Sequence, residues 1–287
     1  MHVTGRVARV RKNPPMDIHG SALVTGASRG IGRAIALELA DRGFATMATM
    51  RDPDAGATMA DETAGRLEVR RLDVTDPSTF DIPTDLRVLV NNAGIDTDYL
   101  PVEHANIDDW RRMFETNVFG VVALTSAALP TLRTNQPSVV CTVTSSSIIA
   151  SVPFFSAYRA SKAAASAFGD SLRVEVAPFG VRVVEILPGP IDTDMFRLST
   201  GEQGAAGFAD YRPLADVAAA LRREHADPRV VDPAQAAARI VDAILDSAGP
   251  MRYGCDPVSL ELLDLWRQCD DETVFTMTGQ ALIDQSR

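Results

Sequence analysis

Tyr158 and Lys162 are the two residues of this chain whose types and spacing best fit proton chemistry. They stand four positions apart, so on a helix they lie on one face and can serve a single site. Apart from Lys12, arginine supplies every other cationic side chain, and only lysine offers a compact ammonium whose pKa responds to its surroundings. The alternative is a coding bias toward arginine that has left Lys162 by chance.

Two polar residues upstream fit the same chemistry. Ser145 lies thirteen residues before Tyr158 at the end of an apolar run, and its hydroxyl can position a carbonyl and stabilise a developing alkoxide. Ser146 and Ser147 are adjacent, so a slip of one position is open, although loop capping is their simpler role. Asn117 interrupts a helical pattern in which asparagine is unfavourable, as happens at functional sites, but a surface asparagine is the alternative.

A glycine cluster in segment 25–32, which reads TGASRGIG, follows an apolar run and opens a helical pattern. Glycine permits tight turning and close approach of the backbone, and the free amides of a helix N-terminus attract anionic oxygens. The cluster therefore predicts a pyrophosphate site, with an ordinary turn as the alternative. The residues expected to contact it are Gly26, Ser28, Arg29, Gly30, Ile31 and Gly32.

The end of the second apolar run bears on the choice of dinucleotide. An acid at this position binds the ribose 2′-hydroxyl of NAD, whereas arginine accommodates the 2′-phosphate of NADP. Here Met50 occupies the place of the acid, Arg51 follows, and Arg29 supplies a second guanidinium. The pattern favours NADP(H) over NAD(H), although Asp52 could instead pair with Arg51 as a solvated loop.

These residues must be positioned by alternating strands and helices. Apolar runs and helical patterns alternate along the chain, which predicts an α/β fold with a doubly wound, parallel, seven-stranded sheet. The expected strands are 21–25, 45–50, 67–71, 86–91, 138–144, 181–187 and 251–255. The expected helices are 31–42, 108–133, 157–177 and 233–246, and segment 75–85 is too short and proline-broken for a crossover helix.

The organisation predicted is an irregular tail, 1–20, and one domain, 21–287. Within the domain, glycine and proline break up 195–229, which we interpret as a mobile substrate lid of short helices, and 257–287 is a C-terminal extension. Phe154, Phe155, Met195, Phe196 and Phe208 surround the expected site in sequence order and indicate an apolar substrate.

Composition excludes several classes of function. A net charge of −10 and a pI near 4.9 argue against nucleic acid or an anionic membrane as the main partner. Three cysteines without CxxC spacing and four scattered histidines predict no disulfide framework and no metal site. The chain shows no apolar run near the roughly 18 residues of a membrane span and no signal peptide, so we expect a cytoplasmic protein.

Taken in order, these motifs resemble the short-chain dehydrogenase/reductase family, which has a Rossmann-like fold. The resemblance covers about 21–256 and rests on the glycine cluster, Asp73-Val74, Asn91-Asn92-Ala93-Gly94, Asn117, Ser145, Tyr158 with Lys162, and the segment PGPIDT at 188–193. It is closest to the single-domain members, and the stretches 47–52 and 178–195 look most like members acting on steroids and related apolar alcohols.

The resemblance implies transfer of a hydride between nicotinamide and a carbonyl or secondary alcohol. Tyr158 would be the proton donor or acceptor, Ser145 would position the carbonyl, and Lys162 would bind the nicotinamide ribose. A phenol has a pKa near 10, so we expect Lys162, or a positively charged nicotinamide ring, to lower the pKa of Tyr158. Asn117 would kink its helix and hold a water that links Lys162 to solvent.

The resemblance also assigns the cofactor contacts and the assembly. Asp73 and Val74 would contact adenine. Segment 91–94, with Asn91, Ala93 and Gly94 as its contacts, would shape the adenosine side and support the central strands. The nicotinamide would be wrapped by Pro188, Gly189, Ile191 and Thr193. A homodimer or homotetramer is expected through helices 108–133 and 157–177. The alternatives are an NAD-dependent enzyme of the same family and a non-catalytic dinucleotide sensor.

Overall fold

A seven-stranded, all-parallel sheet forms the centre of the protein, as the sequence predicts. The computed structural model describes residues 16–200, 204–225 and 227–286, so most of the predicted tail lies outside the described residues. The strands are β1 Ser21–Thr25, β2 Ala45–Met50, β3 Leu67–Arg71, β4 Leu86–Asn91, β5 Ser138–Val143, β6 Val181–Ile186 and β7 Arg252–Tyr253. β7 is shorter than predicted because this edge strand pairs with β6 at only two positions.

The strand order, β3-β2-β1-β4-β5-β6-β7, explains where a ligand can bind. The chain builds outward from β1 through β2 to β3, then returns to the other side of β1 and continues with β4. In such sheets the connections after the two central strands leave in opposite directions, which opens a crevice at their carboxyl ends. The glycine cluster follows β1, and the segment Asn92 to Asp96 follows β4, so both lie at this crevice.

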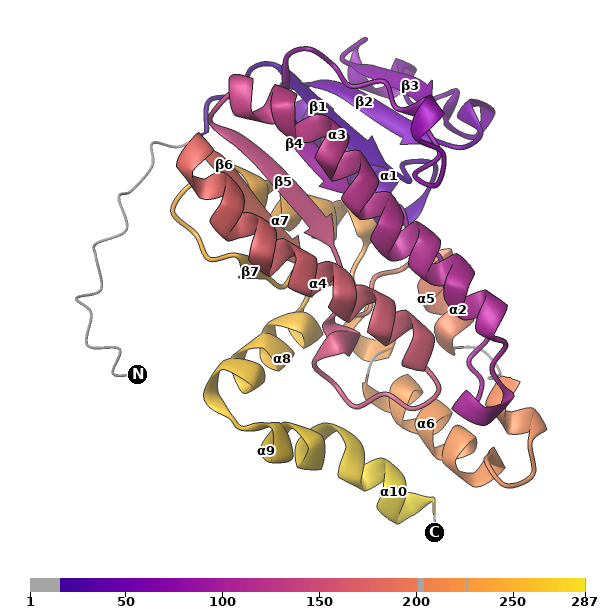
Figure 1. Ribbon diagram of the computed structural model, residues 1–287. Helices are drawn as coiled ribbons and strands as arrows, with labels where there is room; N and C mark the ends of the chain where they lie inside the picture. The colour runs from indigo at the N-terminus through magenta and orange to yellow at the C-terminus, as the bar shows by residue number, and fades with distance from the viewer. Residues whose placement is uncertain (1–15, 201–203, 226, 287) are drawn as a thin grey trace, which may run out of the picture.

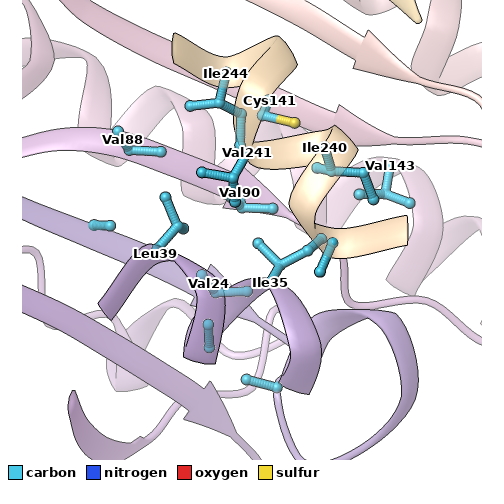
Figure 2. Close-up of a cluster of buried hydrophobic side chains, with 14 of the residues drawn as sticks. Val24, Ile35, Leu39, Val88, Val90, Cys141, Val143, Ile240, Val241 and Ile244 are labelled. Carbon is cyan, nitrogen blue, oxygen red and sulfur yellow. The ribbon is translucent and has the colours of Figure 1, made fainter. Parts of the chain in front are cut away.

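Two helices, α1 Gly30–Arg42 and α7 Pro233–Leu245, pack side by side on one face of the sheet. Figure 2 shows Ile35 and Leu39 of α1 together with Ile240 of α7 beside strand side chains such as Val24 and Val90. All five are fully buried, and burial of such a side chain contributes roughly 1.5–3 kcal/mol. This layer fixes the position of the N-terminus of α1, and therefore of the glycine turn.

The opposite face is covered by α4 Ser156–Val176 and by a helical run that contains α2 Ile107–Phe114 and α3 Gly120–Thr134 (Figure 1). Leu124 and Leu132 of α3 and Leu172 of α4 are buried against the strand residues Leu89 and Val140. The predicted helix 108–133 is therefore present, but a π-helical turn, Glu115–Phe119, divides it. Asn117 lies inside this turn.

The run Ile107–Thr134 has the length and mean hydropathy of a membrane span, which the sequence interpretation did not recognise. It packs against β4 and α4, and 44% of its most apolar window is buried inside the protein. Core helices often have this length and composition, so these two properties alone do not indicate a membrane span.

Two segments extend beyond the sheet at its carboxyl end. The predicted lid contains α5 Asp194–Thr200 and α6 Arg212–His225, while residues 201–203 and 226 lie outside the described residues. At 14 residues α6 is longer than the short helices predicted, because Pro213 stands in its first turn, where its missing N–H has no helical partner. The C-terminal extension forms α8 Pro257–Gln268, α9 Asp271–Phe275 and α10 Ala281–Gln285, and α10 contacts α6 (Figure 1).

Candidate active site

A cavity of about 590 Å³ lies at the carboxyl end of the sheet, and its walls come from the segments that follow β1 to β6. Most of the predicted site residues line it. They are Gly26, Ser28, Arg29, Gly30, Ile31, Gly32, Arg51, Asp73, Val74, Ala93, Gly94, Ser145, Tyr158, Lys162, Pro188, Gly189, Ile191 and Thr193. Asn91 and Asn117 are not among the lining residues.

The glycine turn has the backbone shape that a phosphate cradle requires. Gly26 has φ +65° and Gly30 has φ +57°, both in the left-handed region that favours glycine. A Cβ on Gly26 would lie 2.8 Å from the Cα of Ala93, so a larger residue does not fit against the segment after β4. Because α1 begins at Gly30, its free amides and positive dipole end lie at the cavity. The turn therefore fits a dinucleotide pyrophosphate.

Asn91 does not reach the cavity, contrary to the prediction that it contacts the cofactor, and its neighbour Asn92 lines the cavity instead. Asn91 has the supporting role that was also expected of this segment. Asn91 is the buried last residue of β4, and its amide donates to the Thr125 hydroxyl of α3 at 2.9 Å. Asn92 lines the cavity and donates to the carbonyls of Thr25 at 2.9 Å and Gly26 at 3.2 Å. Asn92 belongs to the motif at 91–94, but it was not singled out from the sequence as a cofactor contact.

Arg51 lines the cavity directly after β2, at the position where the sequence predicts a residue that binds the 2′-phosphate. Asp52, which complicated that interpretation, caps the following 3-10 turn by accepting from the Asp54 amide at 3.1 Å, and the described residues show no Arg51–Asp52 ion pair. Arg29 pairs with Asp194 of α5 at 3.1 Å. Both partners are more than half exposed, so this pair is weak and a phosphate can compete with it.

Asp73 and Val74 follow β3 on the same side of the cavity. The Asp73 carboxylate accepts hydrogen bonds from the backbone and the hydroxyl of Thr75, at 2.9 and 2.8 Å. These bonds lower the pKa of Asp73, with a further contribution from the charges of Arg51 and Arg71. Asp73 is therefore held ionised next to Arg51.

Ser145, Tyr158 and Lys162 line the same cavity. Ser145 begins a 3-10 turn after β5 and accepts from the Ser147 amide at 3.2 Å, so Ser145 itself has the capping role that we had considered for its neighbours. Tyr158 comes from the first turn of α4. Both residues line the cavity, and the Ser145 hydroxyl is close enough to Tyr158 to oppose in part the rise in pKa that burial causes.

Lys162 lies one turn further along α4 and is only 6% exposed. Its Nζ donates to the carbonyl of Val143 at 3.0 Å and lies 5.7 Å from the centre of the Tyr158 ring. Burial lowers the pKa of Lys162 to about 8, although the nearby Asp96 acts in the opposite direction. The spacing argument is thus confirmed in geometry: one helix face presents both side chains to one site.

The expected effect of Lys162 on Tyr158 is not found in the protein alone. Burial raises the pKa of Tyr158, the charge of Asp96 raises it further, and the hydrogen bond with Ser145 only partly opposes them. Desolvation disfavours the phenolate, and Lys162 is not among the groups that offset this effect. The sequence could not show that both groups are buried together.

The arrangement of a glycine turn and a serine, tyrosine and lysine group around one cavity matches a known family. Residues 21–203 match the family model for short chain dehydrogenase. The chain belongs to this family. Its fold, an α/β structure with a seven-stranded parallel sheet, and its class, an oxidoreductase acting on CH–OH groups with NAD(P), follow from that membership.

Similar proteins span most of this short-chain dehydrogenase. The chain is 36% identical over 214 residues to an uncharacterized short-chain type dehydrogenase/reductase of Sinorhizobium fredii, which covers 74% of this chain and 84% of the relative. It is 34% identical over 201 residues to sulfoacetaldehyde reductase 2 of Chromohalobacter salexigens, with 66% and 80% covered. A short chain dehydrogenase from Burkholderia cenocepacia, solved with NADP, has a TM-score of 0.70 at 25% identity, with 92% and 99% covered.

Asn117 supports the dehydrogenase site from behind the cavity wall. Its amide nitrogen donates to the Ile95 carbonyl at 2.9 Å and to the Ser161 hydroxyl at 3.0 Å, and its oxygen accepts from the Ile95 amide at 2.9 Å. Both amide hydrogens are therefore used by the protein, so the side chain cannot also donate to the predicted water. Its observed role is to fix the segment after β4, and a link to solvent stays a prediction.

Asp256 is a supporting residue that the sequence interpretation missed. Its carboxylate accepts from the Gly189 amide at 2.7 Å and from the Ser259 amide at 2.9 Å, so it joins the segment after β6 to the N-terminus of α8. A Cβ on Gly189 would lie 2.5 Å from Oδ1 of Asp256, so this contact needs glycine. The DPVS sequence at 256–259 is a capping signal, but it does not reveal the distant partner.

The apolar residues predicted around the site divide into two groups. Phe155, Met195 and Phe196 line the cavity, as expected. Phe208 instead stacks on His104, with ring centres 3.9 Å apart, and Phe154 lines a smaller hollow beside the site. Asp96, which no prediction included, also lines the cavity, as does Ser147, which was considered from the sequence only as a neighbour of Ser145.

Proposed function

We propose that this protein is an NADP(H)-dependent reductase of carbonyl compounds, and equally a dehydrogenase of the corresponding secondary alcohols. The observation that carries the proposal is the single cavity in which the glycine turn of β1 and α1 meets Ser145, Tyr158 and Lys162. A site that only sensed a dinucleotide would not need a buried lysine and a buried tyrosine on one face of α4.

Each step has a residue to perform it. NADP(H), once bound, supplies or accepts the hydride. Ser145 donates a hydrogen bond to the carbonyl oxygen and so holds it beside Tyr158. Because burial raises its pKa, Tyr158 stays protonated at neutral pH and can donate its proton to the oxygen as the alcohol forms. Lys162 binds the nicotinamide ribose and, through its remaining charge, favours the phenolate that is left.

Preference for NADP(H) rests on Arg51 at the cavity edge and on the capping role that removes Asp52 from it. The Burkholderia structure contains NADP, which agrees with this preference. Sulfoacetaldehyde reductase 2 is by its name a carbonyl reductase, which agrees with the proposed direction. Preference for NADPH would favour reduction in a cytoplasmic setting, where we propose that the protein acts as a homodimer or homotetramer.

Substitution of the tyrosine tests the chemistry. Tyr158→Phe should abolish NADPH-dependent reduction of a panel of ketones, steroids and aldehydes while the dissociation constant for NADPH stays within about threefold. Phe155→Leu is a matched control, because it changes an aromatic residue of the same cavity that donates no proton. Substantial turnover by Tyr158→Phe would refute the assignment, and absence of turnover by the wild type with every substrate would favour a sensor.

Reversal of charge at Arg51 tests the cofactor. Arg51→Asp should lower the ratio of kcat/KM for NADPH to that for NADH by at least tenfold, because a charge-assisted bond to phosphate contributes roughly 1.5–3 kcal/mol. Arg71→Asp is the control, since Arg71 is also near Asp73 but does not line the cavity. A wild type that prefers NADH would overturn the NADP(H) assignment and leave the NAD-dependent alternative.

A further inference from the structure

Asp96 places a carboxylate in the wall of the catalytic cavity, close enough to Tyr158 and Lys162 to influence the pKa of both. One of its oxygens accepts from the Tyr99 hydroxyl at 2.5 Å, and the other accepts from the Thr97 amide at 2.9 Å. An ionised carboxylate has about four acceptor positions. Two remain, so Asp96 can accept further hydrogen bonds from a ligand in the cavity.

The carboxylate is held in place on both sides. Asn117 fixes the backbone of the preceding residue, Ile95, by two hydrogen bonds of 2.9 Å. Tyr99, its hydrogen-bond donor, stacks on Phe155 with ring centres 4.2 Å apart. A group fixed in this way loses little conformational entropy when it binds a partner, which is the condition for a selective contact.

Hydride transfer does not explain this carboxylate, because its charge opposes the phenolate that the reaction leaves on Tyr158. It is also costly in itself: burial raises the pKa of Asp96. The hydrogen bonds from Tyr99 and Thr97, and to a smaller extent the charges of Lys162 and Arg222 of α6, oppose that rise only in part. A carboxylate held in this way gains from a further hydrogen-bond donor in the cavity.

A second polar group in the same wall is also outside the reaction. The Ser147 hydroxyl is buried, and no described residue forms a hydrogen bond with it. Ser147 lines the cavity with Ser145, two residues upstream, and its position is fixed by Arg159, which donates to its carbonyl at 2.6 Å. The protein covers the hydroxyl oxygen even without a ligand, so Ser147 makes no contact with a substrate. A purely apolar substrate would leave the two remaining acceptor positions of Asp96 against carbon, which is unfavourable for binding.

We propose that Asp96 is a specificity-determining residue that binds a hydroxyl group of the substrate, so that the natural substrate is a hydroxylated carbonyl compound rather than a plain ketone. The inference rests on the proposed reductase function and adds the substrate class. The apolar wall of Phe155, Met195 and Phe196 then covers the carbon skeleton.

The test compares three matched substrates: 2-butanone, 1-hydroxy-2-butanone and 2-oxobutanoate. kcat/KM is measured with NADPH for the wild type, for Asp96→Asn and for Asp98→Asn. Asp98 provides a matched control, because it is an exposed carboxylate two residues away that does not line the catalytic cavity. The wild type and Asp98→Asn should prefer the hydroxyketone to 2-butanone by at least tenfold, and Asp96→Asn should lower that preference about tenfold. The ketoacid should be the poorest substrate of the wild type, because its carboxylate meets that of Asp96.

A binding measurement separates this proposal from the proposed function. Calorimetry of the hydroxyketone and of 2-butanone with Tyr158→Phe in the presence of NADPH reports the hydroxyl contact without turnover. If wild-type protein reduces no carbonyl compound but Tyr158→Phe binds the hydroxyketone selectively, and adding Asp96→Asn removes that selectivity, the reductase function fails and the contact stands. The proposal is overturned if the wild type shows no preference for the hydroxyketone, if it prefers 2-oxobutanoate, or if Asp96→Asn slows both ketones equally with a shifted pH profile.

Discussion

Replacement of Lys162 by methionine should change how protein stability depends on pH. The ammonium is buried, and its pKa falls from 10.5 to about 8. Between these values the unfolded chain binds more protons than the native protein, so the stability of the wild type rises with pH across this window. Below pH 8 the native protein bears the full cost of a buried charge, and near pH 10.5 that cost is gone. Lys162→Met has no such group.

The size of the effect follows from the two pKa values. The full difference between the two pKa values corresponds to about 3 kcal/mol. Only part of this free-energy difference develops over the practical range from pH 7.5 to 9.5. The free energy of unfolding of Lys162→Met minus that of the wild type should therefore fall by about 2 kcal/mol across that range. Loss of the hydrogen bond to Val143 shifts this difference by the same amount at every pH, so it does not affect the change with pH.

Urea denaturation of both proteins without cofactor, at half-unit steps of pH, measures this difference. Other groups that titrate in the range, including tyrosines and cysteines, are common to both proteins and drop out. Arg159→Met is a useful control, because it removes a half-buried guanidinium from the same helix, and arginine stays protonated in proteins. A difference that stays constant within about 0.5 kcal/mol, or that grows with pH, would refute the buried, readily deprotonated lysine.

Three further substitutions test the supports of the site. Asp256→Ala should lower the free energy of unfolding by about 2 kcal/mol in urea denaturation and raise the KM for cofactor several-fold, because it removes both a helix cap and the partner of the Gly189 amide. Gly32→Ala should weaken NADPH binding at least tenfold by calorimetry, since its Cβ would collide with the Gly26 carbonyl; wild-type affinity would contradict this. Arg87→Leu should lower the free energy of unfolding by about 2–4 kcal/mol without changing kcat, because this buried residue of β4 donates to the carbonyls of Pro137 and Asp17. A changed kcat with an unchanged free energy of unfolding would contradict this structural role.

The strands, the glycine turn and the pair on α4 could be predicted from the sequence because local patterns determine them. β1 to β4 have the predicted bounds, since each is a short apolar run closed by a polar or turn-forming segment. The glycine turn was equally visible, because its conformation requires glycine at Gly26 and Gly30. The pairing of Tyr158 with Lys162 follows from helix geometry alone.

What could not be predicted depends on contacts between distant segments. Asn91 and Asn92 are identical neighbours, and only the direction in which β4 ends decides which of them holds the glycine turn. Asp256 acts on Gly189 from 67 residues away. The raised pKa of Tyr158 depends on burial and on Asp96, neither of which has a pattern in the sequence.

The π-helical turn Glu115–Phe119 sets the rotation of α2 relative to α3. It adds one residue to the winding of the run, and one residue corresponds to about 100° of rotation about a helix axis. Deletion of a single residue here would give a smoother helix while turning all of α2, including the cavity residue Arg112, to a new angle. It would also move Asn117 off the backbone of Ile95. The number of residues in this turn therefore determines how α2, at the cavity, is rotated relative to α3, which packs on the sheet. Insertion or deletion of one residue here should be tolerated far less than substitution of a side chain.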